Sequence, residues 1–403
     1  MKITAIKTFQ VEEFANVLWV HVETDAGLHG LGETFYGAGA VAAHIHDTLA
    51  SRLVGRNPLN IEALHKEMLN LPNAQSSTGV EYRAASAVDI ALWELLGKVC
   101  DQPVHRLLGG LCFDRMRIYN TCAGTRYVRT NAIKPVDTWN VADGDGPYED
   151  LDAFMTRAGD LARDLLDNGI STMKIWPFDP PAMENKGLLI TPEQLRTALR
   201  PFEQIREAVG DKMDILVEFH SLWSLPVAKQ IARALESFSP TWYEDPIRMN
   251  SPQALAEYQR STDVWVCASE TLGSRYAYKE FLDRDAADVV MADLCWTGGL
   301  TEGRKIAAMA ETYHRPFAAH DCIGPVGFAA AIHMSFSQPN TLIQESVRAF
   351  YKGWYRELVT EVPRIENGFV YPMEGPGLGT ELLPAFFERS DLRVRTSDLD
   401  VFA

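Results

Sequence analysis

The first hundred residues change from one hydrophobic pattern to another. Residues 1–35 alternate apolar and polar positions, as half-buried strands do, and Asp25-Ala26-Gly27 supplies the chemistry of a tight turn. We therefore expect antiparallel strands joined by a hairpin. Residues 41–108 follow a helical period instead, and the segment 81–100 shows a broad apolar helix face. Strands followed by helices predict a small α+β domain.

From about residue 115, short apolar runs alternate with amphipathic segments. The amphipathic segments include 191–209, which opens with the helix-start signal Thr191-Pro192-Glu193, and 301–314. Repeated strand–helix units predict a closed (β/α)8 barrel. A doubly wound open sheet is the alternative, but such a sheet usually has a glycine-rich first turn, which this chain lacks. The eight apolar runs are 116–121, 172–176, 214–219, 241–244, 264–270, 288–294, 316–320 and 341–346.

The two patterns divide the chain into two domains. We expect residues 1–115 to form an α+β capping domain, to which residues 369–403 return, and residues 116–368 to form the barrel. The segment 122–148, between the first two apolar runs, is unusually long for a barrel loop. Long loops in compact domains are generally functional or mobile, so we expect this one to reach over the barrel mouth.

Composition narrows the class of partner. The 403 residues are 46% hydrophobic and carry a formal net charge of −16. Nucleic-acid binding needs clustered Lys and Arg, and the basic clusters here are no longer than pairs, so we expect no nucleic-acid partner. The amino terminus lacks a secretory apolar segment, and no apolar run reaches about 18 residues, so we expect a cytoplasmic location and no membrane. A small anionic substrate is compatible with the charge where a local cation attracts it.

Three consecutive apolar runs of the barrel region end in glutamate. Glu218, Glu244 and Glu270 are each separated by 26 residues. Barrel enzymes do their chemistry at the C-terminal ends of the strands, so these carboxylates should point into one volume. One such glutamate alone would be a solvated loop residue, but the repeated spacing favours a site. Gathered like charges need a cation, and an all-oxygen ligand set favours Mg²⁺ over zinc or copper.

The remaining runs bring further titratable groups to the same face. Lys174 ends the second run, Asp293 lies in the sixth, His320 ends the seventh and Glu345 lies in the eighth. A carboxylate beside an imidazole fixes its tautomer and raises its basicity. Asp293 and His320 are therefore typical of a general base, although such a pair alone is as often structural.

Together these motifs resemble the enolase superfamily, mandelate racemase subgroup, over essentially the whole chain. Residues 84–110 are similar to the subgroup's helix signature. The motifs Val-Glu-Phe-His, Trp-Tyr-Glu-Asp-Pro and Ala-Ser-Glu, which contain the three glutamates, resemble its metal-ligand strand ends, and Asp293 with His320 resembles its Asp–His dyad. The resemblance implies Mg²⁺-assisted removal of the proton α to a carboxylate, which gives an enediolate.

Two details narrow this implied activity. The subgroup's Lys-x-Lys stands here as Lys174-Ile175-Trp176, and the missing second lysine weakens the interpretation as a two-base racemase. His220, two residues after the first metal ligand, resembles the general acid of galactonate- and mannonate-type dehydratases. The resemblance therefore implies a dehydratase of an aldonate or aldarate that yields a 2-keto-3-deoxy acid, with His320 as base and His220 as acid. Lys174 would polarise the substrate carboxylate or face the other side of C2, and Glu345 would hydrogen-bond the substrate.

Two alternatives stay open. An epimerase would use Lys174 and His320 on opposite faces of C2, and a non-catalytic descendant of the family would only bind its ligand. The cycloisomerase branch fits less well, because it resembles a pattern with lysine where Asp293 stands. The resemblance also implies a homo-oligomer with an even number of subunits, such as a dimer, tetramer or octamer.

Specificity is expected from segments that cover the barrel mouth, because lid loops commonly select the substrate. The expected lid segments are 12–30 and 72–82. Trp176 is either a packing or a sugar-stacking residue, whereas we expect Trp296 to pack in the core. The candidate substrate contacts from the lid and the long loop are Ser76, Ser77, Thr78, Arg126 and Tyr127.

Overall fold

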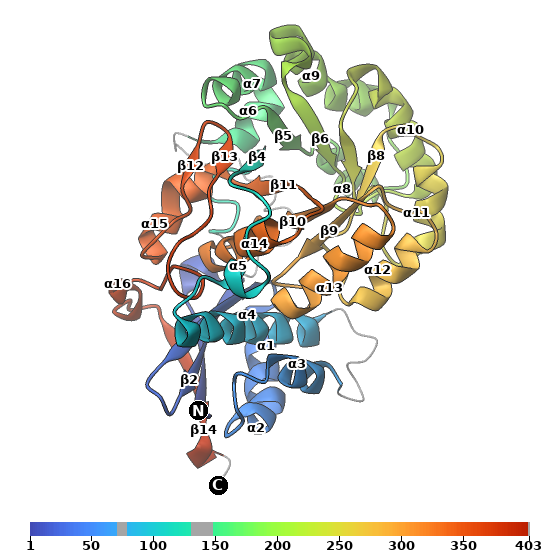
Figure 1. The fold of residues 1–403 in the computed structure, drawn as a ribbon. Helices are drawn as coiled ribbons and strands as arrows, with labels where there is room; N and C mark the ends of the chain where they lie inside the picture. The colour runs from blue at the N-terminus through green and yellow to red at the C-terminus, as the bar shows by residue number, and fades with distance from the viewer. Residues whose placement is uncertain (71–78, 130–147, 402–403) are drawn as a thin grey trace.

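The computed structural model describes residues 1–70, 79–129 and 148–401. Within these residues the chain forms a four-stranded antiparallel sheet backed by helices and a closed barrel of eight parallel strands (Figure 1). The predicted fold class, a (β/α)8-type barrel with an α+β cap, is therefore confirmed. None of the helices in the described part of the chain is both long and apolar enough to cross a bilayer.

The eight predicted apolar runs are confirmed as the barrel strands. Each strand pairs in parallel with the next, and the last pairs with the first, with Glu345 opposite Tyr119. This closure excludes the open-sheet alternative. Buried side chains such as Tyr119, Leu216 and Trp242 fill the barrel interior. The strands are β4 (Met116–Thr121), β5 (Thr172–Ile175), β6 (Asp214–Glu218), β7 (Trp242–Glu244), β8 (Trp265–Ala268), β9 (Val289–Asp293), β10 (Phe317–His320) and β11 (Thr341–Ser346).

Helices surround the barrel on its outside (Figure 1). The helix predicted from the Thr191 signal begins there: the Thr191 side chain accepts a hydrogen bond from Gln194 N, and the Thr191 backbone N–H donates one to Gln194 Oε1. The helices are α6 (Asp150–Thr156), α7 (Ala158–Asp167), α8 (Asp179–Asn185), α9 (Pro192–Val209), α10 (Leu225–Leu235), α11 (Pro252–Gln259), α12 (Arg275–Leu282), α13 (Gly299–Thr312), α14 (Pro325–Ser337) and α15 (Tyr355–Leu358).

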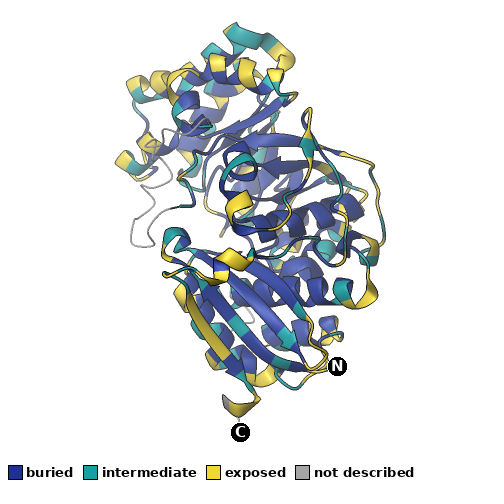
Figure 2. Ribbon diagram, turned by 90° about the vertical axis from the view of Figure 1, so that its left-hand side faces the viewer, coloured by how far each residue is buried: buried dark blue, intermediate teal, exposed yellow. Residues whose placement is uncertain are grey.

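The cap is built from both ends of the chain. Its sheet runs in the order β14-β1-β2-β3, and β14 forms an exposed edge, as Figure 2 shows. The strands are β1 (Ile3–Gln10), β2 (Val17–Thr24), β3 (His29–Phe35) and β14 (Arg393–Asp398), and the helices are α1 (Ala38–His44), α2 (Ala50–Leu53), α3 (Ile61–Leu69), α4 (Val80–Cys100), α5 (Val104–Leu107) and α16 (Pro384–Phe387). Before the chain returns to the cap, β13 (Phe369–Val370) pairs with β4 and with β12 (Ile365–Glu366).

Helix α4 lies between the cap sheet and the barrel and is largely buried. It packs so closely on β3 that the strand has room only for glycine at two positions. A Cβ atom at Gly32 would lie 1.9 Å from the Ala87 carbonyl oxygen, and one at Gly30 would lie 1.8 Å from that of Ala91. This close packing fixes β3 of the cap sheet against α4.

We expect Gly32→Ala to lower the free energy of unfolding by roughly 3 kcal/mol, because the added methyl group forces α4 and β3 apart. Urea unfolding followed by circular dichroism measures the change. The control is Gly39→Ala in α1, where the added methyl group meets none of the described residues within 4 Å. Equal stability of Gly32→Ala and the wild type would show that α4 does not press on β3.

A buried carboxylate joins the cap to the barrel. Glu33 of β3 accepts hydrogen bonds from Val326 N at 3.3 Å and Gly327 N at 3.0 Å. These amides belong to the first turn of α14, where a negative charge is favoured by the helix dipole. Burial nevertheless outweighs these bonds and raises the pKa of Glu33 to about 7. Glu33 thereby supports the helix that follows His320.

The raised pKa of Glu33 gives a pH-dependent contribution to stability. The carboxyl titrates near pKa 4.5 when unfolded and near 7 when folded, so the native state binds this proton more tightly. Its contribution is full below about pH 4.5 and is lost as the pH rises to about 7. We expect the stability difference between wild type and Glu33→Gln to fall across this window in urea titrations. A difference independent of pH would show that the pKa is not raised.

Candidate active site

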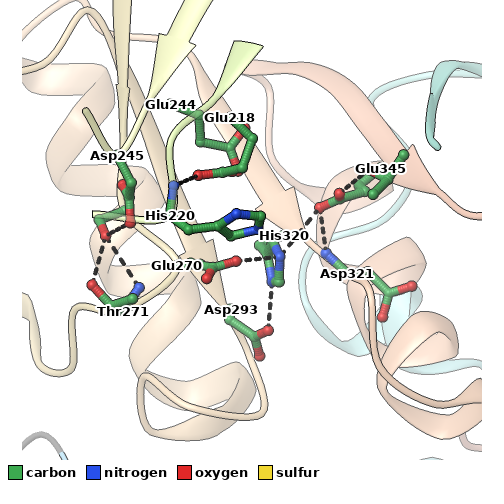
Figure 3. Close-up of polar contacts among 12 residues, drawn as sticks. Glu218, His220, Glu244, Asp245, Glu270, Thr271, Asp293, His320, Asp321 and Glu345 are labelled. Atoms are coloured by element: carbon green, nitrogen blue, oxygen red, sulfur yellow. Dashed lines mark hydrogen bonds and ion pairs between the residues drawn. The ribbon is translucent and has the colours of Figure 1, made fainter. Parts of the chain in front are cut away.

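The three glutamates gather at the catalytic end of the barrel (Figure 3). Glu218 and Glu244 end β6 and β7 and lie opposite each other in the strand pairing. Glu270 was expected to end its strand, but β8 stops at Ala268 and Glu270 lies in the following turn. Single ligand atoms of Glu244, Glu270 and His320 all lie within 4.8 Å of one another. The predicted carboxylates are therefore close together, with His320 beside them.

The environment of Glu218 fits a bound cation. Its Oε2 atom is buried and has no hydrogen-bond partner among the described residues, and Lys174 Nζ lies 3.6 Å away. Burial and the adjacent Glu244 carboxylate raise the pKa of Glu218 well above its ordinary value. A buried carboxylate oxygen without a donor, next to further carboxylates, is unfavourable until a cation binds it. Oxygen atoms of this kind are the ligands that Mg²⁺ prefers.

The predicted Asp–His pair is formed between neighbouring strands. His320 at the end of β10 lies opposite Asp293 of β9, and His320 Nδ1 is 2.7 Å from Asp293 Oδ2. Cys295 N donates to the other Asp293 oxygen at 2.7 Å, which fixes the carboxylate. His320 Nε2 is 2.5 Å from Glu270 Oε2. Burial lowers the pKa of His320, but Glu270 and Glu345 outweigh burial and hold that pKa well above its ordinary value.

Lys174 of β5 is a fixed cation within the site. Its Nζ lies 2.7 Å from Glu244 Oε1 and 2.9 Å from Glu345 Oε1. Burial lowers the pKa of Lys174, but these carboxylates outweigh burial and hold that pKa well above its ordinary value. Glu345 is itself held by the Asp321 backbone N–H at 2.7 Å and by the Thr121 hydroxyl. Neither of these two partners was predicted from the sequence.

His220 also has a carboxylate partner, which the sequence reasoning missed. Its Nδ1 lies 2.7 Å from Oδ2 of Asp179, a fully buried residue that begins α8. The His220 backbone N–H donates to Glu218 Oε1 at 2.6 Å, which ties the histidine to the candidate metal ligand. Burial lowers the pKa of His220, but Asp179 outweighs burial and raises it. Asp179 stands between two prolines, Pro177 and Pro180, so neither strand nor helix periodicity singled it out.

The chemically active side chains share one pocket with aromatic residues from the cap and the barrel. Trp296 is buried in the core, as expected, but it also forms part of the pocket wall, because it lies just beyond β9 and its ring centre is 5.6 Å from that of His320. Trp176 lines the pocket as well. The lining residues are Phe35, Tyr36, Thr121, Tyr127, Lys174, Trp176, His220, Glu270, Trp296, His320 and Cys322.

The cap covers the pocket in a different way from that expected. The cap residues that line the pocket are Phe35 and Tyr36, at the C-terminal end of β3. The hairpin within the segment 12–30 lies at the opposite end of that strand and does not line the pocket. Arg126 is exposed and lines a separate hollow beside Glu12 and Glu13. Ser76, Ser77 and Thr78, together with residues 130–147 of the long loop, lie outside the described residues.

Comparisons with known proteins agree with this geometry. Residues 3–109 match the N-terminal domain of mandelate racemase and muconate lactonizing enzymes, and residues 157–386 match the enolase C-terminal domain-like family. The D-galactonate dehydratase of Variovorax paradoxus is 31% identical over 389 residues, which cover 95% of this chain and 92% of that protein.

Solved structures place the whole chain in the same family. An enolase of the mandelate racemase subgroup from Agrobacterium tumefaciens is 45% identical over the full length of both chains, with a TM-score of 0.89. A protein from Salmonella enterica serovar Typhimurium, provisionally named a dehydratase, is 31% identical with a TM-score of 0.84 and covers 98% of this chain and 99% of its own. The chain therefore belongs to the mandelate racemase subgroup of the enolase superfamily.

Proposed function

We propose that the protein is a dehydratase of an acid sugar, an aldonate or aldarate, and that it forms a 2-keto-3-deoxy acid. The observation that carries this proposal is the presence of two Asp–His pairs in one pocket, beside three gathered glutamates. His320 is paired with Asp293, and His220 is paired with Asp179. Dehydration needs one group that accepts a proton from carbon and one that gives a proton to the leaving oxygen.

Glu218, Glu244 and Glu270 would hold Mg²⁺ in this proposal. When bound, the cation supplies positive charge that stabilises the negative charge developing on the substrate carboxylate. The choice of ligands is supported by the buried Glu218 oxygen, which lacks a donor within the described residues, and by the all-oxygen set. Lys174, charged and buried beside Glu244 and Glu345, adds a second positive group near the substrate carboxylate.

The two histidines divide the proton transfers between them. Because Asp293 occupies Nδ1 of His320, the C2 proton would go to its Nε2. This nitrogen contacts Glu270 in the structure and would be freed when Glu270 binds the cation. Because Asp179 occupies Nδ1 of His220, a proton on its Nε2 would go to the 3-hydroxyl as the C3–O bond breaks and water leaves. The resulting enol then takes a proton at C3 and becomes the 2-keto acid, so one water is lost overall.

The epimerase alternative fits the geometry less well. It needs a second base that can take a proton from the other face of C2, and the sequence suggested Lys174. In the structure Lys174 Nζ is held in ion pairs with Glu244 and Glu345, so the amine offers no free lone pair. These ion pairs support a role for Lys174 as a binding cation.

A panel of aldonates and aldarates, assayed for 2-keto acid in the presence of Mg²⁺, tests the proposed function. At least one member should give the 2-keto-3-deoxy acid, and inversion at C2 without loss of water would identify an epimerase. A protein that binds acid sugars but transforms none of them would favour the non-catalytic alternative. Light scattering on the same preparation tests our further expectation of an even-numbered homo-oligomer.

A further inference from the structure

Arg83 of the cap lies close to the pocket wall. It belongs to the first turn of α4, and its guanidinium carbon is 5.0 Å from the centre of the Trp296 ring. Trp296 in turn lines the active-site pocket, and its ring centre is 5.6 Å from that of His320. Trp296 therefore contacts both Arg83 and the pocket, and Arg83 itself lies just outside the residues that line the pocket.

Arg83 lacks a carboxylate partner within the described part of the chain. It forms no ion pair there, and its buried Nε has no hydrogen-bond partner. Burial lowers the pKa of Arg83, and Asp293, Tyr36 and Glu270 only partly offset this; both carboxylates are bound to His320. A guanidinium stays protonated in proteins, so a partly buried one without a partner is unfavourable until an anion pairs with it.

Arg304 also packs on a tryptophan ring, but unlike Arg83 it has a carboxylate partner among the described residues. Its guanidinium carbon lies 5.6 Å from the Trp93 ring centre, so it too packs over an indole face. Unlike Arg83, it also binds a carboxylate, Glu62, at 2.9 Å. Packing on tryptophan therefore does not by itself explain the missing partner of Arg83.

We propose that Arg83 binds a second anionic group of the substrate, so that the preferred acid sugar is an aldarate, which has a carboxylate at each end. This inference rests on the proposed dehydratase function. The reacting carboxylate would lie at the barrel end beside Lys174, and the distal one would pair with Arg83. The rings of Trp296 and Tyr36, whose centres are 5.6 Å apart, would face the carbon chain between them. A planar guanidinium favours a carboxylate over a neutral hydroxyl because it donates two parallel hydrogen bonds.

The test compares kcat/KM for a hexarate and for the hexonate of the same configuration, with Mg²⁺ present. We expect the wild type to prefer the hexarate. Arg83→Met should reduce kcat/KM for the hexarate by roughly 10- to 100-fold, chiefly through KM, and reduce that for the hexonate much less. Arg83→Lys, which keeps the charge but loses the planar fork, should retain part of the preference. The matched control, Arg304→Met, should leave the ratio between the two substrates unchanged.

A wild type that prefers the hexonate, or a ratio that Arg83→Met changes by less than about twofold, would overturn the role of Arg83 and leave the dehydratase function standing. If no acid sugar is dehydrated, the proposed function itself fails. Calorimetric titration of the hexarate then still tests the anion site: a Kd at least roughly tenfold weaker in Arg83→Met supports it, and equal Kd values in both proteins reject it.

Discussion

His320→Asn is expected to abolish both the exchange of the C2 hydrogen with D2O and the formation of product. Asparagine can still hydrogen-bond Asp293 but cannot accept a proton, so the first chemical step loses its base. A positioned general base contributes up to about 10⁴-fold, and we expect a loss of roughly that size in kcat. Proton NMR of the substrate in D2O measures exchange and product in one experiment.

The control for this variant is His314→Asn. His314 is exposed just beyond α13, and its substitution should leave both rates near those of the wild type. Circular dichroism of both variants checks that they fold. Persistent C2 exchange in His320→Asn would show that another group removes the proton and would remove His320 from the proposed mechanism.

His220→Asn should separate the two chemical steps. The base is intact in this variant, so C2 exchange continues, but the 3-hydroxyl has no proton donor and leaves slowly. We expect product formation to fall by roughly 10²- to 10⁴-fold while exchange in D2O persists. The same NMR experiment records the rates of C2 exchange and of product formation, and a rise in the ratio of exchange to product formation is the expected result.

Asp179→Asn extends this test to the partner of His220. Because Asp179 orients the ring through Nδ1, its substitution should lower the elimination rate more than the exchange rate, as His220→Asn does. Near-normal turnover by His220→Asn would mean that another group donates the proton. Equal losses of exchange and elimination would mean that His220 serves the first step as well.

Much of the fold follows from local pattern. Barrel strands are buried on both faces, so each appears in the sequence as a short apolar run, and the runs that end in Glu218 and Glu244 mark the strand ends directly. The Thr191 cap was visible because capping depends on neighbouring residues. The close packing of β3 on α4 is also marked in the sequence, by Gly30 and Gly32. The reason for these glycines is visible only in the structure, where the α4 backbone leaves no room for a Cβ atom.

The parts of the site that sequence reasoning missed depend on contacts between distant segments. Asp179 reaches His220 from the irregular segment that leads into α8, and no periodicity describes such a segment. Trp296 resembles any core tryptophan in the sequence, and only its position beyond β9 also makes it a pocket wall. Tyr36 and Arg83 come from the cap, so their nearness to His320 depends on how two parts of the chain pack together.

The central claim is that a divalent cation held by Glu218, Glu244 and Glu270 allows a carbon acid to lose its proton. Turnover of an acid sugar in D2O, before and after treatment with EDTA, tests it most directly. We predict a 2-keto-3-deoxy product carrying one deuterium at C3, no C2 exchange or product after EDTA, and recovery of both when Mg²⁺ is restored. Undiminished turnover in EDTA would contradict this account.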